Sequence, residues 1–173
     1  FSSHLKNRLY NYICYHTNLS TMASILYVSS LDPESPGGIQ TLIRNQIRGL
    51  EQLGHDVQLL VVPSSASRSA IDFFPKRRYL RTQDNFPPKE WLRYAYYNYQ
   101  ERLVRQSIQQ KDFDIIHAGM IRCYPALYVA NRKGIPSVVS THAMELGNRR
   151  LAQAALRVAD AAHCVSQYTK GLV

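Results

Sequence analysis

Apolar runs and helical patterns alternate along the chain from residue 24 onward. Short runs rich in Ile, Val, Leu and Ala predict five strands, at residues 24–29, 57–62, 114–117, 136–141 and 161–165. Apolar residues at three- and four-residue steps predict helices between them, at residues 39–53, 87–110, 124–132 and 149–158. This alternation is typical of an open parallel sheet with helices on both faces. The sequence therefore predicts an α/β fold.

Turn residues support the same order of elements. The loop at residues 31–38 contains two Pro and two Gly, and Gly54 follows the first predicted helix as a stop signal. Residues 24–62 therefore form one strand–helix–strand unit, whose crossover is right-handed and whose strands are parallel.

A single domain over residues 22–173 is expected, because a chain of 173 residues suffices for one well-cored domain. Residues 1–21 lack a continuous apolar stretch, so we predict a poorly structured extension, with natural translation beginning at Met22. Residues 63–88 are rich in Ser, Pro and basic side chains and are predicted to be a mobile excursion. Ser166 is placed to cap a helix that the sequence cuts off.

Charge and composition narrow the class of protein further. The formal net charge of +9 indicates attraction to an anion, such as nucleic acid, an acidic membrane leaflet or a phosphorylated substrate. No apolar run approaches the ~20 residues of a membrane-spanning helix, so none is expected. Three scattered cysteines do not make a disulfide framework or a CxxC metal site, which favours a reducing, cytosolic setting.

The residues that close the predicted strands are the first candidates for chemistry, because ligands of open parallel sheets bind beyond the carboxyl ends of the strands. Gly37 and Gly38 lie between a strand and a helix N-terminus, where backbone N–H groups can approach a phosphate or a sugar hydroxyl. A tight turn that needs glycine only for its backbone is the alternative. The segment is neither GxGxxG nor a P-loop, so it gives no support to nicotinamide binding or ATP hydrolysis.

Two histidines also follow strands. His142 could act as a general acid or base or donate a hydrogen bond to a substrate, and a structural imidazole is the alternative. His117 ends another strand and could simply be buried and hydrogen-bonded. Glu145, three residues after His142, gives a weak hint of a metal site, but no third ligand is evident and no bound metal is expected.

Taken together, these segments resemble the retaining glycosyltransferases of the GT4 type. Four segments in order carry the resemblance, at residues 37–57, 112–117, 134–142 and 159–170. The resemblance implies the GT-B architecture, in which two Rossmann-like domains face each other across a cleft. The N-terminal domain mainly contacts the acceptor, and the C-terminal one holds the nucleotide sugar. This chain resembles only the first, so we expect a Rossmann-like acceptor-side domain truncated before the donor-binding domain.

The resemblance also implies roles for individual residues. His142 would be the catalytic residue facing the reacting sugar, and the loop with Gly37 and Gly38 would approach the donor phosphates or the acceptor. The other expected substrate-binding residues lie at or after strand ends, and they are His117, Thr141, Glu145 and Ser166. Many relatives carry a second histidine two places after the one matching His117, where this chain has Gly119.

The implied reaction transfers a sugar from a nucleotide diphosphate sugar to an acceptor hydroxyl with retention at the anomeric carbon. No cofactor or metal is expected, because helix N-termini and basic side chains meet the phosphate charge in this class. The product class suggested is a cell-envelope polysaccharide or lipid-linked glycan. A non-catalytic glycan- or nucleotide-binding module is the alternative.

Basic and aromatic residues interleaved over residues 76–105 suggest one further partner. They suit an anionic membrane that presents a lipid-linked acceptor, which would place a cytoplasmic protein peripherally on the inner face of the membrane. A solvated basic helix with its aromatic residues packed on the sheet is the alternative. No recognised nucleic-acid motif is present, so no nucleic acid is expected as a partner.

Overall fold

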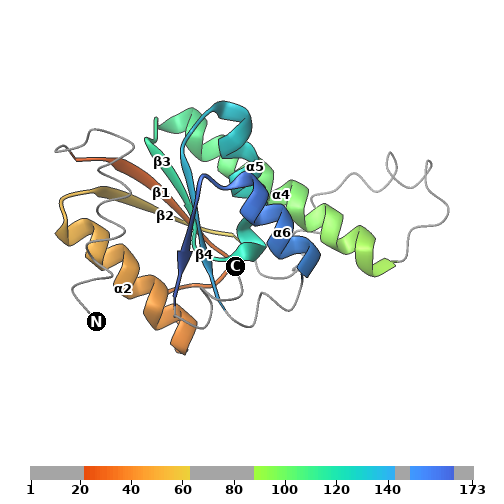
Figure 1. Ribbon diagram of the computed structural model, residues 1–173, viewed down its shortest axis with the longest axis horizontal. Coiled ribbons are helices and arrows are strands. Elements are labelled where there is room, and N and C mark those ends of the chain that lie inside the picture. The colour runs from red at the N-terminus through yellow and green to blue at the C-terminus, as the bar shows by residue number, and fades with distance from the viewer. Residues whose placement is uncertain (1–21, 63–87, 143–148, 166–173) are drawn as a thin grey trace.

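The structure is a computed structural model that describes residues 22–62, 88–142 and 149–165 (Figure 1). The predicted extension at residues 1–21 and nearly all of the predicted excursion at residues 63–88 lie outside these ranges.

The described residues form one five-stranded sheet in the order β2-β1-β3-β4-β5, with every neighbouring pair parallel. The strands are β1 (Ser24–Ser29), β2 (Asp56–Val61), β3 (Ile115–Ala118), β4 (Ser137–Thr141) and β5 (Ala161–Cys164). Each lies where the apolar runs predicted it, with small differences at the ends. The predicted open parallel sheet is confirmed.

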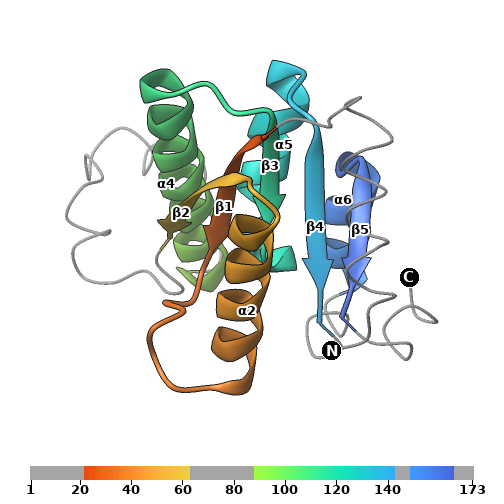
Figure 2. The same ribbon diagram turned by 90° about the vertical axis from the view of Figure 1, so that its left-hand side faces the viewer.

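The helices follow the predicted segments equally closely. They are α2 (Gly38–Gln52), α4 (Pro88–Gln110), α5 (Tyr124–Lys133) and α6 (Arg149–Val158), with a short 3-10 helix η1 (Ile121–Cys123) before α5. Helix α2 covers one face of the sheet, and α4, α5 and α6 lie on the other (Figure 2). This arrangement is the Rossmann-like α/β fold that was expected.

Helix α5 shows how the local sequence sets these boundaries. Pro125 lies in its first turn, where the missing N–H costs nothing. Gly134 ends it in the left-handed conformation with φ 68°, which L residues with a side chain adopt at a cost.

Side chains alternate between the two faces of the sheet, and the two faces differ in chemistry. The face under α4, α5 and α6 is apolar, with Leu26, Ile116 and Val139 in its buried cluster. The face under α2 has a smaller apolar cluster. It also carries buried polar side chains, among them His117 and Ser140. The candidate site lies on this second face.

None of the described helices combines the length and the apolar character needed to span a membrane. Helix α4 is long enough, at 23 residues, but it is too polar.

Candidate functional site

The strand order reverses between β1 and β3, since the chain runs from β1 to β2 on one side and then crosses to β3 on the other. Such a switch point is where open α/β sheets bind ligands, beyond the carboxyl ends of the strands. Helix α2 begins at this same end of the sheet, toward which the arrows of β4 and β5 point (Figure 2). The fold therefore brings the Gly37–Gly38 loop and the residues after β3 and β4 to one edge.

The loop before α2 has a geometry that requires glycine at one position. Gly37 has φ 156°, a conformation that side-chain-bearing residues rarely adopt. No side chain caps the start of the helix, and a Cβ added at Gly38 would meet only open space. The space beside Gly38 is thus open, whereas the side chain of Gln40 lies against Gly37. The anion cradle itself stays a prediction.

His142 directly follows β4 and is 5% exposed. Its Nε2 lies 3.1 Å from the carbonyl oxygen of Gly119, just beyond β3. A carbonyl only accepts, so Nε2 donates and carries a proton. In the neutral imidazole, Nδ1 is then the proton acceptor. The backbone contact therefore fixes which nitrogen of His142 can act as a base.

Gly119 has no room for a larger side chain. A Cβ there would lie 2.6 Å from Cε1 of Tyr27, whose side chain is fully buried. The amide of Gly119 donates to the carbonyl of Val28 at 2.8 Å, which ties this residue to β1. The ring of Tyr27 thus leaves room only for glycine at position 119.

His117 is buried and hydrogen-bonded. Its Nε2 lies 2.9 Å from Oγ of Ser140, and its ring packs against that of Tyr27 with centroids 4.5 Å apart. Burial, with a smaller contribution from His163, lowers the pKa of His117 to about 3. This imidazole is therefore neutral at ordinary pH and lies within the fold, while its predicted contact with substrate stays a prediction.

Ser140 is the centre of a polar row that sequence reasoning missed. Oγ of Ser140 lies 3.2 Å from Nδ1 of His163 on β5, in addition to its contact with His117. Gln46 of α2 covers the row, with Nε2 2.9 Å from the same Nδ1 and Oε1 accepting from the Tyr27 hydroxyl. The sequence did contain a signal for this row. Each of three neighbouring apolar runs carries a polar residue, and these three positions fall on the same face of the sheet.

Of the three remaining predicted site residues, the structure describes only Thr141. Thr141 is fully buried, and its hydroxyl lies 3.5 Å from the carbonyl oxygen of His163, so it faces the neighbouring strand. Glu145 and Ser166 lie outside the described residues. Within the ranges that the structure describes, no three His, Cys, Asp or Glu side chains are grouped to hold a metal ion.

Acid is expected to destabilise the fold because three histidines have lowered pKa values. Burial is the largest cause for His55, His117 and His163. The unfolded chain takes up their protons as the pH falls through about 6.5, whereas the folded chain resists, so stability present above that pH is lost below it. For His117 the loss continues toward pH 3. Urea unfolding at pH 7.5 and pH 5 measures this loss of stability. Equal unfolding midpoints at the two pH values would contradict the expectation.

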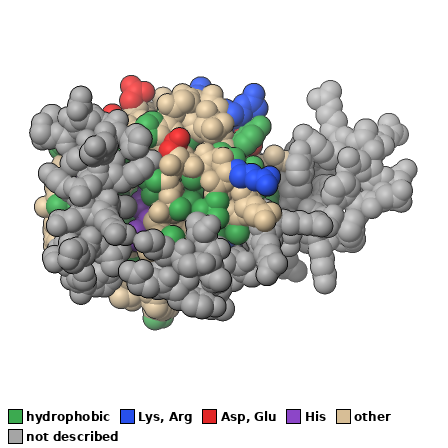
Figure 3. Space-filling model, viewed as in Figure 1, with side chains coloured by type: hydrophobic (Ala, Val, Ile, Leu, Met, Phe, Trp, Pro, Cys, Tyr) green, Lys and Arg blue, Asp and Glu red, His purple; other side chains and the backbone are tan. Residues whose placement is uncertain are grey.

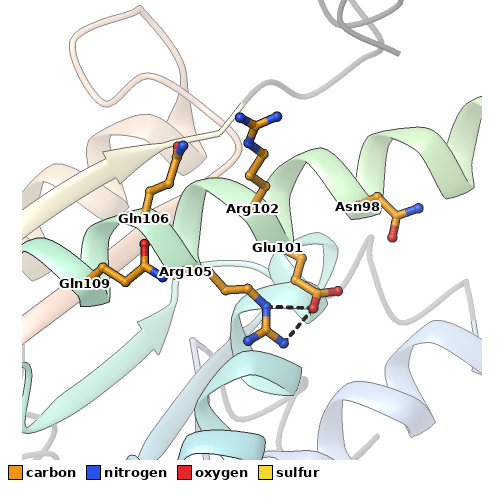
Figure 4. Close-up of a pocket in the computed structure, with 6 residues that line it drawn as sticks. All are labelled: Asn98, Glu101, Arg102, Arg105, Gln106 and Gln109. Atoms are coloured by element: carbon orange, nitrogen blue, oxygen red, sulfur yellow. Dashed lines mark hydrogen bonds and ion pairs between the residues drawn. The ribbon is translucent and has the colours of Figure 1, made fainter. Parts of the chain in front are cut away.

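Two open hollows lie away from the strand ends. One, of roughly 460 Å³, runs along α4 and includes Arg102, Arg105 and Glu101 among its lining residues (Figure 4). Arg105 and Glu101 form an ion pair at 2.8 Å within it. The second, of roughly 330 Å³, adjoins Phe113 and Ile135, which precede β3 and β4. Both are therefore distinct from the candidate site.

The fold and the edge just described define an α/β domain with a candidate ligand site beyond the carboxyl ends of its parallel strands. A family model described as Glycosyltransferase Family 4 matches residues 36–173, which is most of the chain. The protein therefore belongs to Glycosyltransferase Family 4, and the resemblance predicted from the sequence is confirmed.

Comparison with solved structures gives a match to the crystal structure of SsfS6, a glycosyltransferase of Streptomyces sp. SF2575. The TM-score is 0.43 at 12% sequence identity, and the match covers 79% of this chain and 44% of that one. The chain thus spans less than half the length of that protein. Comparison with curated proteins found no match.

Proposed function

We propose that the chain is the acceptor-side domain of a transferase that moves a sugar from a nucleotide diphosphate sugar to an acceptor hydroxyl with retention. Family membership over residues 36–173 supports glycosyl transfer as the general activity. The observation that carries the proposal furthest is His142, a nearly buried imidazole at a strand end whose backbone contact leaves Nδ1 as its proton acceptor.

In the proposed reaction, His142 contacts the reacting sugar or the acceptor hydroxyl. The opening at Gly38 lets an anionic oxygen approach the start of α2, where the helix dipole favours negative charge. Charge on the departing nucleoside diphosphate is met by helix N-termini and basic side chains, so the proposal includes no metal or cofactor. A second domain, following residue 173, supplies the grip on the nucleotide.

Release of nucleoside diphosphate from a panel of nucleotide sugars tests this proposal. The assay uses the longer protein encoded by the reading frame that contains this chain, with candidate acceptors present. Release that depends on an acceptor supports transfer. Binding of nucleotide sugar or glycan without any release would contradict it and favour a non-catalytic binding module.

We further propose a peripheral contact with the cytoplasmic face of an anionic membrane. The excess of 21 Lys and Arg over 12 Asp and Glu supports attraction to such a surface. On the face seen in Figure 3, the described Lys and Arg side chains (blue) are few and separate. Tyr96 and Gln100 of α4 are buried, so part of this helix packs inward. The basic residues at 76–81 and Arg93 are the main remaining candidates for the contact, and their side chains are outside the described residues.

Co-sedimentation with vesicles measures this contact. The protein is expected to bind vesicles containing anionic phosphatidylserine several-fold more strongly than neutral phosphatidylcholine vesicles, and less strongly as salt rises. Replacing Lys76, Arg77 and Arg78 by glutamine should reduce the binding, whereas a charge-matched triple change at Arg44, Arg48 and Arg132 should not. Equal binding to both vesicle types would contradict the membrane contact.

A further inference from the structure

The buried polar row on the α2 face places a second histidine beside His142. Ser140 pairs with His163 in the register of β4 and β5, and His142 directly follows β4, two residues after Ser140. The alternation of side chains, continued one residue beyond the strand, directs His142 to the same side as Ser140. The electrostatic interaction with His142 is also among the causes that lower the pKa of His163, after burial. His163 is therefore a neighbour of the candidate catalytic imidazole, on the adjoining strand.

The hydrogen bonds around His163 determine which of its two ring nitrogens carries the proton. The Tyr27 hydroxyl donates to Oε1 of Gln46 at 2.5 Å, so the amide nitrogen of Gln46 faces the row. That nitrogen, which only donates, lies 2.9 Å from Nδ1 of His163 and 3.5 Å from Oγ of Ser140. A proton on Nδ1 would point at these amide hydrogens. Nδ1 must therefore accept, and the proton of the neutral imidazole is on Nε2.

We propose that His163 is a positioning residue of the candidate site, held by Gln46 and Ser140 as an uncharged imidazole with its proton on Nε2, next to His142. An uncharged neighbour leaves His142 able to hold positive charge during a reaction, whereas an imidazolium at position 163 would repel that charge. This consequence for turnover rests on the proposed function. The state of His163 itself does not.

The surroundings of His163 agree with this role. Burial is the main cause that lowers its pKa, followed by the nearby His142. The other titratable groups of the row are His117, whose own pKa is lowered by burial and by His163, and the phenol of Tyr27, whose pKa is raised by burial. None of the hydrogen bonds described among Tyr27, Gln46, His117, Ser140 and His163 involves a carboxylate. Nothing in the described surroundings therefore favours a charged His163.

The Gln46→Glu substitution tests the proposal with almost no change of shape. A carboxylate still accepts from Tyr27, but it presents an acceptor and a negative charge to Nδ1 of His163, so His163 should become protonated. Gln52→Glu is the matched control, because Gln52 is exposed on the same helix. Nitrogen-15 NMR of the imidazoles, assigned with a His163→Gln variant, reports each protonation state in this 173-residue chain.

In the unmodified chain and in Gln52→Glu, His163 is expected to show a protonated Nε2 and a bare Nδ1 at pH 6.5. In Gln46→Glu, both nitrogens should be protonated at pH 7. A protonated Nδ1 in the unmodified chain would overturn the proposal, with no variant needed.

In the longer protein, Gln46→Glu should lower kcat about tenfold, with KM for the nucleotide sugar little changed. An unchanged kcat alongside a charged His163 would also overturn the positioning role. Absence of turnover in the unmodified protein would count against the proposed function alone, because the NMR result stands without it.

Discussion

Replacing His142 by alanine is expected to lower the turnover of nucleotide sugar by the longer protein by roughly 10²- to 10⁴-fold, the usual contribution of a positioned acid–base group. His142 is nearly buried at the carboxyl end of β4, and its Nε2 is committed to the carbonyl of Gly119. Alanine removes Nδ1, the nitrogen left to exchange a proton or to contact the substrate. Steady-state release of nucleoside diphosphate is the measurement.

A matched control variant separates this loss of turnover from a general effect on folding. His55 is also mostly buried, but it lies before β2, at the opposite end of the strands, where Nδ1 accepts the amide of Ala23 at 3.3 Å. A His55→Asn variant can keep that acceptor and should retain most of the turnover. Melting temperatures of both variants show whether they fold. A folded His142→Ala protein with turnover near that of the unmodified enzyme would remove His142 from the chemistry.

The Gly119→Ala substitution is expected to cost about 1–3 kcal/mol of folding stability, the usual range for overpacking a well-packed interior. The added Cβ would lie 2.6 Å from Cε1 and 2.9 Å from the hydroxyl oxygen of Tyr27. Tyr27 has no open space to move into, because it is fully buried and held by Gln46. The measurement is the free energy of unfolding from urea titration.

Two further variants test whether the ring of Tyr27 causes the loss of stability in Gly119→Ala. Gly49→Ala lies within α2, where an added Cβ has no atom within 4 Å, so it should stabilise the chain by roughly 0.5–1 kcal/mol. In a Tyr27→Val background the ring is absent, and Gly119→Ala should then cost much less than in the unmodified chain. An equal cost in both backgrounds would show that the ring of Tyr27 is not the obstacle.

The fold could be predicted from the sequence because its signals are local. Runs of apolar residues set β1 and β4, and the three- and four-residue steps after Gly38 set α2. Gly134 ends α5 in the left-handed conformation that its position in the sequence indicates. On the long helix, Val104 is buried, and Leu103 and Ile108 are partly buried against the same core.

The candidate site could be predicted only in part, because its partners are distant in the sequence. The strand-end rule picked out His142 and the glycine loop, since it depends only on where a strand stops. The contact between His142 and Gly119, and the obstacle that Tyr27 presents to a side chain there, depend on the order of strands in space. Gln46 and His163 are 117 positions apart and meet only once α2 packs on the sheet.

Helix α2 joins two parts of the site mechanically. Its first turn follows Gly37, where an anionic ligand would approach, and Gln46 lies eight positions beyond Gly38, about 12 Å along the axis. If a helix of this length moves as a stiff rod, a ligand that drew its start inward would also shift the amide that holds His163. Linkage is reciprocal: whatever the ligand does to the proton affinity of His163, a proton on His163 does to the affinity for the ligand.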